Sequence, residues 1–554
     1  MKLIECVPNF SEGRDPSVID AITSAITVVE GAQLLDVDPG AATNRTVVTF
    51  VGPPAAVEEA AFRAIQTAAA LIDMTKHHGE HPRMGATDVC PFVPLQDVTM
   101  AECVALARRL GRRVGDELGI PVFLYEDAAS DENRRSLAVI RKGEYEGLAD
   151  RSDAPDFGPA EFNPRSGATA IGAREFLIAY NINLNTRDRR LANQIAGVLR
   201  ETGRPRRDEG GAILRDAEGV ALREPGQFKE LRGVGWYIEE YGRAQLSFNL
   251  TNHTVTSLHE VFDAACREAD ARGLRVTGSE LVGLVPRRAL LAAGDHYLRR
   301  QGATTGVPEA ERIHAAVLSL GLDDLGPFDP AAKVIEYRYT GAPTGLIAGS
   351  VAGFVDELSS SSPAPGGGSV AALCGSLSAG LSAMIAALTF TKKGMEEVRG
   401  AMEDLGQRAQ ALKDWFLQAV DRDTDAFNQV LAAMRLPDKT ESDIAVRTKA
   451  MESANQQATQ VPLEVLGRSV EALELALVVA RDGNPNAVTD AGVAGACALA
   501  AGEGAALNVR INLGSLNDAA WASTTESAAA DLIERCRTLS AEVRETVETA
   551  LRGK

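Results

Sequence analysis

The hydrophobic pattern changes near residue 350, and this change limits the folds open to the chain. Before it, short β-branched runs such as KLIECV, AQLLDVD and RTVVTFVG alternate with the helical apolar spacing of PPAAVEEAAFRAIQTAAALI. After it, the β-branched runs disappear and long Ala- and Leu-rich helical patterns take over. We therefore expect an α/β part followed by an all-helical part.

The α/β part contains two successive cycles of strands and helices, which predict two subdomains. The second cycle opens with FLIAYNINL and closes with KVIEYRY, both interpreted as strands, and a long Gly-, Pro- and Asp-rich loop precedes it. A chain of 554 residues also exceeds what one hydrophobic core supports. The predicted fold is multidomain: two α/β (α+β sandwich-like) subdomains at 1–178 and 179–339, a linker at 340–349, and an all-helical domain at 350–554.

Composition narrows the class of partner. A net charge of −19 argues against a nucleic-acid or membrane-surface role, so we expect neither partner. Residues 369–390 are long enough to span a membrane, but their Ala, Ser and Gly content favours a buried bundle helix. Scattered single cysteines and an N-terminus without signal-peptide features predict a cytoplasmic protein.

Three of the seven histidines lie within five residues, in KHHGEHPRMG. His77 and His81 have the spacing of two metal ligands on a helix, but Gly79 and Pro82 favour a loop, and no C-x-x-C occurs in the chain. A histidine on such a loop suits acid/base chemistry near neutral pH. We predict a catalytic loop without metal; a metal site or ordinary polar loop residues are the alternatives.

Two further patterns concern anions. The segment APGGGSVAAL has three glycines before a helix, which either cradle an anion with backbone N–H groups or form a tight helix entry capped by Ser369. A basic cluster in this acidic chain either binds an anionic ligand or is solvated surface. It consists of Arg187, Arg189, Arg190, Arg204, Arg206 and Arg207.

Several longer motifs carry a family resemblance. The segments ECVPNFSEGRD, LLDVDPGAATNRTVVTFVG, KHHGEHPRMGATDVCPF and DFGPAEFNPRSGATAIGAREFLIAYNIN resemble, in order, the motifs of formiminotransferases. APGGGSVAAL, VDRDTDAF and GNPNAVTDAGVA resemble those of formimidoyltetrahydrofolate cyclodeaminases. The chain therefore resembles the bifunctional formiminotransferase-cyclodeaminase family. The polar excursion at 204–227 is similar to that of its bacterial members.

The resemblance implies a folate enzyme of histidine degradation. It would transfer the formimino group of N-formimino-L-glutamate to N5 of tetrahydrofolate, then cyclise 5-formimino-tetrahydrofolate to 5,10-methenyl-tetrahydrofolate with release of ammonia. Tetrahydrofolate, expected in its polyglutamylated form, is the co-substrate. No metal is expected, and a homo-oligomer is. The alternatives are a single-activity formimino or formyl transferase with a C-terminal assembly domain, and a non-catalytic folate-binding or scaffold protein.

For the transferase half, the resemblance implies His81 as the acid/base group. Asp38 is its candidate partner, either orienting the imidazole or stabilising a cationic intermediate, with a turn-forming role as the alternative. Asn44 and Arg45 are candidates for holding a substrate carboxylate. The implied folate-binding loop consists of Gly158, Pro159, Ala160, Glu161, Phe162, Asn163, Pro164, Arg165, Ser166 and Gly167.

For the cyclodeaminase half, the resemblance implies that Asp423 carries the proton. Asp421 and Asp425 lie two residues away on either side, and residues two apart do not share a helical face. Either one of the three points inward and the others are solvated, or the three carboxylates crowd together at the helix surface. The implied substrate-binding residues of this half are Gly366, Gly367, Gly368, Ser369, Asn484 and Asp490.

Overall fold

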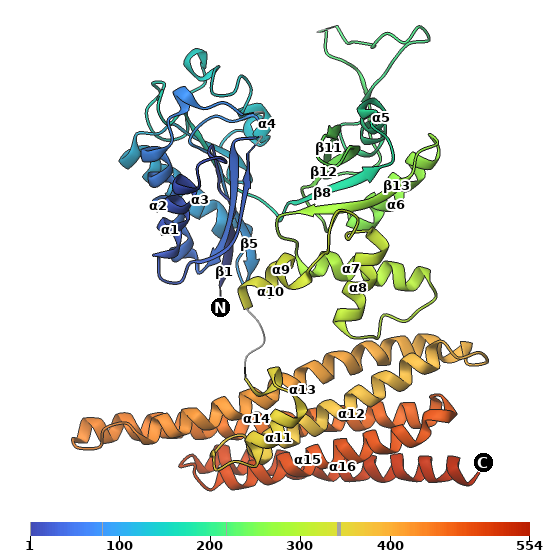
Figure 1. The fold of residues 1–554 in the computed structure, drawn as a ribbon. Helices are drawn as coiled ribbons and strands as arrows, with labels where there is room; N and C mark the ends of the chain where they lie inside the picture. Colours follow the sequence, from blue (N-terminus) through green and yellow to red (C-terminus); the bar gives the residue numbers. More distant parts are fainter. Residues whose placement is uncertain (1, 42, 80, 218, 341–344, 554) are drawn as a thin grey trace. The chain divides into compact units, whose positions relative to one another are not determined.

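The computed structural model describes residues 2–41, 43–79, 81–217, 219–340 and 345–553. The chain divides into two compact units. The first unit contains the residues up to Ala293 and the segment that starts at Val317; the second, helical unit contains Gly294–Ala316 and the C-terminal part of the chain. Figure 1 shows sheets with helices in the first unit and long helices in the second. The predicted fold class is confirmed.

The first subdomain is built on a seven-stranded mixed sheet. β4 (Arg45–Gly52) pairs antiparallel with β3 (Gln33–Gly40), and both β1 (Leu3–Cys6) and β2 (Asn9–Phe10) pair antiparallel with β4 and β5. β5 (Thr87–Gln96), β7 (Thr169–Ala173) and β6 (Val122–Glu126) then run parallel to one another. Predicted strands KLIECV, AQLLDVD and RTVVTFVG correspond to β1, β3 and β4.

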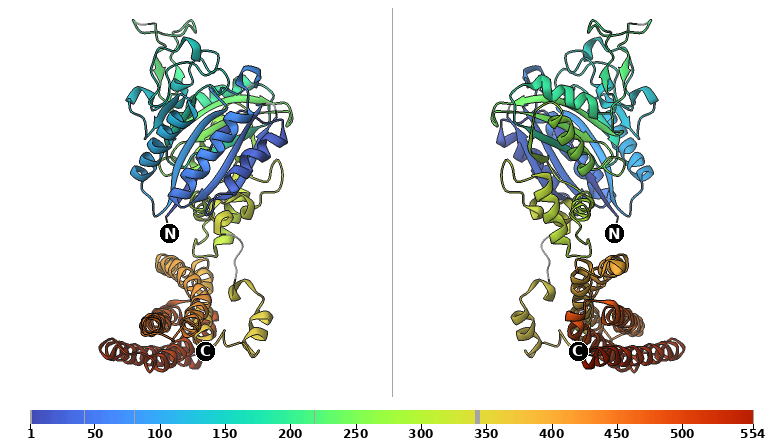
Figure 2. Two further views of the ribbon diagram at one scale, coloured as in Figure 1. Left: turned by 90° about the vertical axis from the view of Figure 1, so that its left-hand side faces the viewer. Right: turned by 90° about the vertical axis from the view of Figure 1, so that its right-hand side faces the viewer.

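Three helices cover one face of this sheet. They are α1 (Pro16–Thr27), α2 (Pro54–Leu71) and α3 (Met100–Leu118). The side chains on one face of the strands, such as those of Ile4, Cys6 and Phe50, pack into the core against these helices. Because side chains alternate across a strand, Glu5, Val47 and Thr49 point to the opposite face. The face away from the helices is therefore the one available for a binding site (Figure 2).

The second subdomain is a four-stranded antiparallel sheet in the order β11-β12-β8-β13. Its strands are β8 (Ile178–Leu184), β11 (Leu231–Ile238), β12 (Arg243–Leu250) and β13 (Val276–Val282). Helices α5 (Arg189–Leu199) and α6 (Leu258–Asp270) pack on it. The predicted polar hairpin at 204–227 contains the short antiparallel pair β9 (Arg204–Pro205) and β10 (Arg223–Glu224).

The prediction of a strand at KVIEYRY is wrong. This segment forms α9 (Pro330–Lys333) and α10 (Ile335–Thr340). The side chain of Asp329 accepts a hydrogen bond from the Ala331 N–H, and Pro330 occupies the first helical turn, so the chain enters these residues with helical geometry. Only Val334 makes a strand-like contact, an isolated parallel bridge to Val285. The helix-start signal at Asp329 and Pro330 thus outweighs the β-branched residues Val334 and Ile335.

The helical unit is a bundle of long helices. Its described helices are α11 (Val351–Leu358), α12 (Gly367–Phe390), α13 (Arg399–Met434), α14 (Glu441–Asp482), α15 (Val488–Leu513) and α16 (Ala519–Arg552). Small residues let α12 and α15 approach closely, and Gly504 lies against Ala371. Since Gly367 lies near Asn508, α12 and α15 run antiparallel.

A segment that precedes the predicted 340–349 linker also belongs to the helical unit. This segment, residues 301–308, joins α7 (Arg287–Arg300) to α8 (Glu309–Leu320). The Thr305 N–H and hydroxyl donate to Glu403 of α13, at 3.1 and 2.5 Å, and Gly306 lies against Gly406. Of the predicted linker, residues 341–344 lie outside the described residues, and Leu346–Ala348 form a short 3-10 turn.

Two helices are long and apolar enough to cross a membrane by length and composition, Gly367–Phe390 and Pro485–Leu513. The most apolar window of the first is 56% buried inside the bundle and that of the second 44%. Both helices supply core residues of the helical unit, as the sequence predicted for residues 369–390.

Candidate functional site

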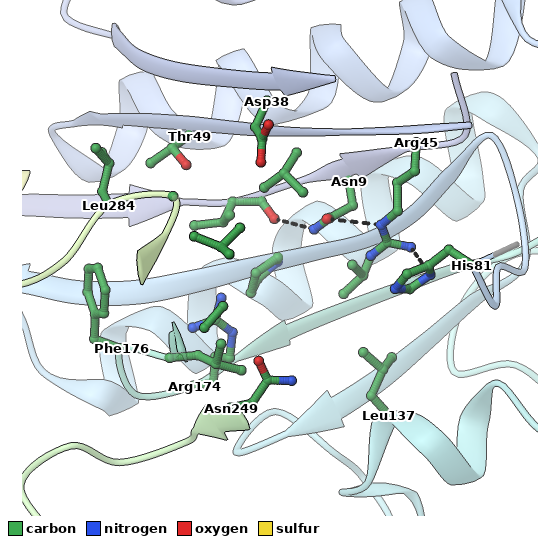
Figure 3. A pocket seen from close by; sticks show the side chains of 18 of the residues that line it. Asn9, Asp38, Arg45, Thr49, His81, Leu137, Arg174, Phe176, Asn249 and Leu284 are labelled. Carbon is green, nitrogen blue, oxygen red and sulfur yellow. Dashed lines mark hydrogen bonds between the residues drawn. The ribbon is translucent and has the colours of Figure 1, made fainter. Parts of the chain in front are cut away.

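The first unit contains a cavity of about 420 Å³ on the sheet face away from α1, α2 and α3 (Figure 3). Strands of the seven-stranded sheet form one wall, and Asn249 and Leu284 of the second subdomain contribute to another. Phe176, which lies between β7 and β8, also lines the cavity. The polar lining is rich in charge. It consists of Glu5, Asn9, Asp36, Asp38, Thr43, Arg45, Thr49, His81, Tyr125, Glu126, Arg141, Arg174, Arg232 and Asn249.

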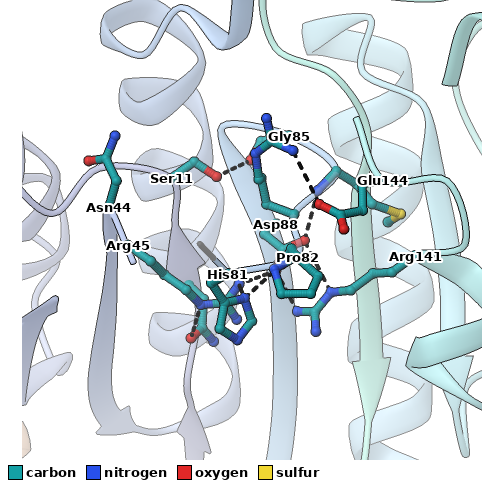
Figure 4. Close-up of polar contacts among 12 residues, drawn as sticks. Ser11, Asn44, Arg45, His81, Pro82, Gly85, Asp88, Arg141 and Glu144 are labelled. Atoms are coloured by element: carbon teal, nitrogen blue, oxygen red, sulfur yellow. Dashed lines mark hydrogen bonds and ion pairs between the residues drawn. The ribbon is translucent and has the colours of Figure 1, made fainter. Parts of the chain in front are cut away.

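His81 lies at one side of this cavity, on the loop between the short 3-10 turn Met74–Lys76 and β5. Its Nδ1 is 2.7 Å from the Pro82 carbonyl oxygen and 3.2 Å from Nη1 of Arg45 (Figure 4). The Pro82 oxygen can only accept a hydrogen bond, so it requires a proton on Nδ1, whereas the Arg45 N–H requires a lone pair there. The shorter contact favours an Nδ1–H that donates to Pro82, which leaves Nε2 with the lone pair.

The electrostatics around His81 favour its neutral form. Burial, and then the nearby positive charges of Arg45 and Arg141, lower the pKa of His81 to about 4. The sequence led us to expect an imidazole with a pKa near neutrality, whereas the imidazole of His81 is uncharged across the physiological pH range in this cavity. An anion bound at the two arginines would offset their charge and raise the pKa of His81 toward its usual value.

Asp88 holds both arginines in place. Its side chain is fully buried and forms ion pairs with Arg45 and Arg141 (Figure 4). The two arginines hold the pKa of Asp88 below its usual range although burial alone would raise it. Asp88 also accepts a hydrogen bond from the Met84 N–H at 3.0 Å, which ties the histidine loop to β5. One carboxylate thus positions two cations next to the imidazole.

The side chain of Asn44, the other predicted carboxylate-binding residue, forms hydrogen bonds within the protein. It is buried with φ of 48°, accepts a hydrogen bond from the Gly13 N–H at 3.0 Å, and donates to the His78 carbonyl at 3.1 Å. Asn44 is not among the cavity-lining residues, whereas Arg45 is. His77 is buried against the Asn44 carbonyl at 2.8 Å, so this histidine stabilises the loop.

Asp38 lines the same cavity as His81 but is not bonded to it. It lies on β3, opposite Val47, near the Thr49 side of the cavity (Figure 3). Among the described residues, no hydrogen bond joins Asp38 to His81. Burial, and then the neighbouring Asp36, raise the pKa of Asp38. The arrangement suits interaction with a cation in the cavity better than orientation of the imidazole.

The predicted folate loop, 158–167, lies beside the histidine loop, and the described residues that line the cavity include none of it. Gly167, at φ of +67°, forms an antiparallel bridge with Gly85, and a Cβ at either position would strike the other backbone. The Asn163 side chain accepts from the Ser166 N–H at 3.0 Å, and the Phe162 ring lies 5.6 Å from that of Tyr145. The ten-residue loop has a fixed shape, as its two glycines and two prolines predict.

In the helical unit, Asp423 of α13 faces the glycine-rich start of α12. Ser369 Oγ donates to Asp423 at 2.9 Å, and a Cβ on Gly368 would collide with the same carboxylate. Burial raises the pKa of Asp423, although Ser369 opposes the shift. Asp421 instead accepts from the Leu346 N–H at 2.8 Å, and Asp425 is exposed. Gly366 is the N-cap, so Ser369 lies inside the helix and does not cap it.

Asn484 and Asp490 do not join this group within one chain. The Asn484 N–H donates to Thr389 Oγ1 at 2.8 Å and its side chain accepts from Lys392, near the end of α12. Ser369 is near the beginning of α12, about 30 Å away at the helical rise per residue. Asp490 lies in the first turn of α15, which runs antiparallel to α12, so it too lies at the far end.

Sequence reasoning missed several charged residues of the cavity region, among them Glu5, Asp88 and Arg141. Glu5 and Asp88 stand inside the quoted motifs but have no spacing that marks them, and Arg141 lies in an unremarkable polar stretch. Only the pairing of β1 with β4 and the ion pairs of Asp88 reveal their positions. Within the described ranges, no group of three or more His, Cys, Asp or Glu side chains could hold a metal ion.

Comparison with known proteins matches both parts of the chain. Residues 3–174 match the formiminotransferase domain, N-terminal subdomain, residues 179–340 match the formiminotransferase domain, and residues 350–531 match formiminotransferase-cyclodeaminase. The formimidoyltransferase-cyclodeaminase of Dictyostelium discoideum is 43% identical over 97% of both chains, and that of Mus musculus 43% identical over 99% of both. The glutamate formimidoyltransferase of Streptococcus pyogenes serotype M1 is 41% identical over 54% of this chain and 94% of its own.

An α/β unit with a charged, histidine-containing cavity, joined to a helical unit with a buried carboxylate at a glycine-rich helix start, defines a two-part group-transfer enzyme. The chain belongs to the formimidoyltransferase-cyclodeaminase family. The predicted bifunctional activity in folate and histidine metabolism is thereby confirmed, as is its assignment to the transferases and lyases. The enzyme is folate-dependent.

Proposed function

We propose that the cavity of the first unit is the site where the formimino group of N-formimino-L-glutamate passes to N5 of tetrahydrofolate. The observation that carries the assignment is His81, a neutral imidazole in a charged cavity with Nε2 as its free base. Arg45 and Arg141, held by Asp88, supply positive charge for a carboxylate of the donor. The predicted loop 158–167 remains our candidate for binding the pterin.

The proton balance of the transfer needs one group with two roles. N5 attacks the amidine carbon, the new N–C bond forms, and Nε2 of His81 takes the N5 proton. The bond between that carbon and the glutamate nitrogen then breaks, and the imidazolium returns the proton to the departing nitrogen. A donor carboxylate at Arg45 and Arg141 would raise the pKa of His81, so the base gains proton affinity only once the donor is bound.

A matched pair of histidine variants tests the assignment. His81→Ala is expected to lower the transfer rate about 10²-fold or more, as loss of an acid/base group commonly does. His78→Ala, on the same loop but outside the cavity lining, should keep the rate within about twofold, the margin of a surface change. Equal rates in wild type and His81→Ala between pH 6 and 9 would exclude this role.

We propose Asp423 as the proton acceptor of the cyclodeaminase. N10 of 5-formimino-tetrahydrofolate attacks the formimino carbon, the N10 proton moves to the carboxylate, and the carbon–nitrogen bond to ammonia breaks after that proton is delivered to the leaving nitrogen. The support is that Asp423 is the member of the acidic run that meets Ser369 and Gly368. Asp423→Asn should stop ammonia release while Asp425→Asn, at an exposed position, should not.

We further propose that the enzyme is a homo-oligomer in which two copies pair along α12 and α15. Both helices expose large apolar side chains, which in an aqueous protein mark a surface that a partner covers. The pairing also supports a shared site: the predicted residues near Ser369 and near Asn484 lie at opposite ends of α12, and an antiparallel partner brings unlike ends together. The exposed side chains are Leu377, Met384, Leu388, Val493, Leu507 and Ile511.

Complementation of two inactive variants tests the shared site. Asp423→Asn and Asp490→Asn chains are each expected to lose ammonia release. If each site draws on two copies, co-refolded mixtures form some dimers with one intact site and regain up to about a quarter of wild-type activity. No recovery in mixtures that form mixed dimers contradicts a shared site. A monomer by light scattering contradicts the oligomer itself.

Three further assignments are proposals of the same kind. A cytoplasmic location is supported by the scattered placement of the seven cysteines along the sequence. A polyglutamylated folate is supported by the arginine cluster in an otherwise acidic chain, and a reaction without metal is supported by the acid/base residues of both sites, which full activity after chelation would test. A bacterial type of the family is supported by the exposed hairpin that carries β9 and β10.

A further inference from the structure

Glu5 is the most unusual group in the first-unit cavity. Its side chain is 3% exposed, and among the described residues no group donates a hydrogen bond to its carboxylate. It stands opposite Val51 of β4 and Val93 of β5, on the strand face shared with Val47 and Thr49. A buried carboxyl group thus lines the cavity without a hydrogen-bond donor among the described residues.

Two further carboxylates face the same cavity from the neighbouring strand. Asp36 stands opposite Thr49 and Asp38 opposite Val47, and since directly paired residues point to the same face, both lie on the face of Glu5. The charges of Lys333 and Glu280 also affect the pKa of Asp38. Those of Arg174 and Glu336 affect the pKa of Glu5. We name the wall made by Glu5, Asp36 and Asp38 the acidic wall.

The acidic wall lies on β1 and β3, and the arginines of the cavity lie on other elements. Asp38 lies on one side of the cavity, and Arg45 and His81 lie on another (Figure 3). Burial raises the pKa of Glu5 to about 7, although the positive charge of Arg174 opposes the shift. The shift reflects the free-energy cost of a buried carboxylate that accepts no hydrogen bond. A ligand with a cation at this wall would remove that cost, and its anionic groups would meet the arginines.

We propose that the acidic wall, through Glu5, selects a transfer donor that carries a protonated formamidine and rejects its neutral formyl counterpart. The inference rests on the proposed assignment of this cavity to the transferase. A formamidinium presents two N–H groups in a fork, and a carboxylate accepts both, as it does from a guanidinium. A formyl group places a carbonyl oxygen where one of those N–H groups would be, so two acceptors face each other in a buried site.

The size of the discrimination follows from the buried acceptor. A site that hydrogen-bonds a substrate N–H can reject an analogue that lacks it by about 10²-fold or much more, because the protein group is left unpaired. N-formyl-L-glutamate differs from N-formimino-L-glutamate at that one group. It is therefore the matched probe, and the rest of the ligand serves as its own control.

The experiment compares the KM of N-formimino-L-glutamate with the inhibition constant of N-formyl-L-glutamate, both with tetrahydrofolate present. Wild type should favour the cationic donor by about 10²-fold or more, and Glu5→Gln should reduce that preference to below about tenfold. Glu5→Asp keeps the charge and should keep part of the preference. Cyclodeaminase turnover of the same samples on supplied 5-formimino-tetrahydrofolate verifies that the chain is folded.

The outcomes separate the inference from the site assignment. A similar loss of affinity for both compounds in Glu5→Gln overturns the selection by charge but leaves the cavity as the transferase site. Unchanged affinities in Glu5→Gln, with His81→Ala inactive, also overturn the inference alone. If neither variant alters transfer, both the inference and the assignment of the cavity fail.

Discussion

Ser369 of α12 donates a hydrogen bond to Asp423 of α13, over 2.9 Å, and so links the glycine-rich helix start to the carboxylate of the proposed deaminase site. The bond acts on the charged form of Asp423. It opposes the burial that raises the pKa of this group. The hydroxyl therefore helps to keep the proton acceptor ionised.

Ser369→Ala should accordingly shift the pH dependence of ammonia release. Without the hydrogen bond the pKa of Asp423 rises further, and since the ionised carboxylate takes the N10 proton, the acidic limb of the profile should move to higher pH. Ser369→Thr keeps a hydroxyl and should retain more of the wild-type profile. A uniform drop in rate at every pH would contradict this role and point to a general packing effect.

Gly368→Ala should strongly lower cyclodeaminase activity without unfolding the protein. The added Cβ collides with the Asp423 carboxylate, while alanine inside a helix is favoured over glycine by about 1 kcal/mol. Gly400→Ala on α13 is the matched control, because a Cβ at this exposed position meets nothing within 4 Å. We expect ammonia release to fall about 10²-fold in Gly368→Ala and to stay unchanged in the control, with formimino transfer normal in both.

Asp88→Asn tests the ion pairs beside His81. Loss of this fully buried charge leaves Arg45 and Arg141 without compensation, and breaking a buried ion pair in this way costs about 3–5 kcal/mol. Urea unfolding of the full chain, followed by a signal from the first unit, should report that loss. Asp116→Asn, at an exposed position on α3, should change stability by less than about 0.5 kcal/mol.

The sequence predicted well those features that rest on local patterns. The strands at β1, β3 and β4 follow from β-branched runs, and the histidine loop follows from Gly79 and Pro82. It could not predict the cavity wall at Glu5, because that depends on which face of β1 meets β4 and β5. Nor could it separate Asn484 from Ser369, since their distance is set by the length of α12 and not by the motifs.

Glu5→Gln should alter stability in a pH-dependent way. Burial raises the pKa of Glu5 from 4.5 to about 7, so the folded state holds this proton more tightly than the unfolded state. The associated stability is fully present below pH 4.5 and is lost as pH rises through about 7. The glutamine variant lacks the ionisation and should be more stable than wild type at pH 8, by up to about 3 kcal/mol.

Urea unfolding of both chains at pH 5 and pH 8 measures this effect. We expect a small difference at pH 5, where Glu5 has begun to ionise in the unfolded state, and a much larger one at pH 8. A gap of the same size at both pH values would mean that the change acts through packing and not through the proton. Such a stability gain, together with weaker donor selection, would show that the wild type retains a destabilising group for its function.

The last prediction concerns why two activities share one chain. A folate whose polyglutamate tail stays bound while the pterin end moves meets the second site at a high effective concentration, without any new contact. An anionic tail needs basic surface, and the chain has a local arginine cluster despite its net charge of −19. Mixing excess His81→Ala with Asp423→Asn protein forces the intermediate to leave one active site and find another. With a polyglutamylated folate, that mixture should show a lag before methenyl product that the intact enzyme lacks, and a monoglutamate folate should reduce the difference. Equal lags with the long-tailed folate would rule out transfer by tethering and leave joint expression or assembly as the reason for the fusion.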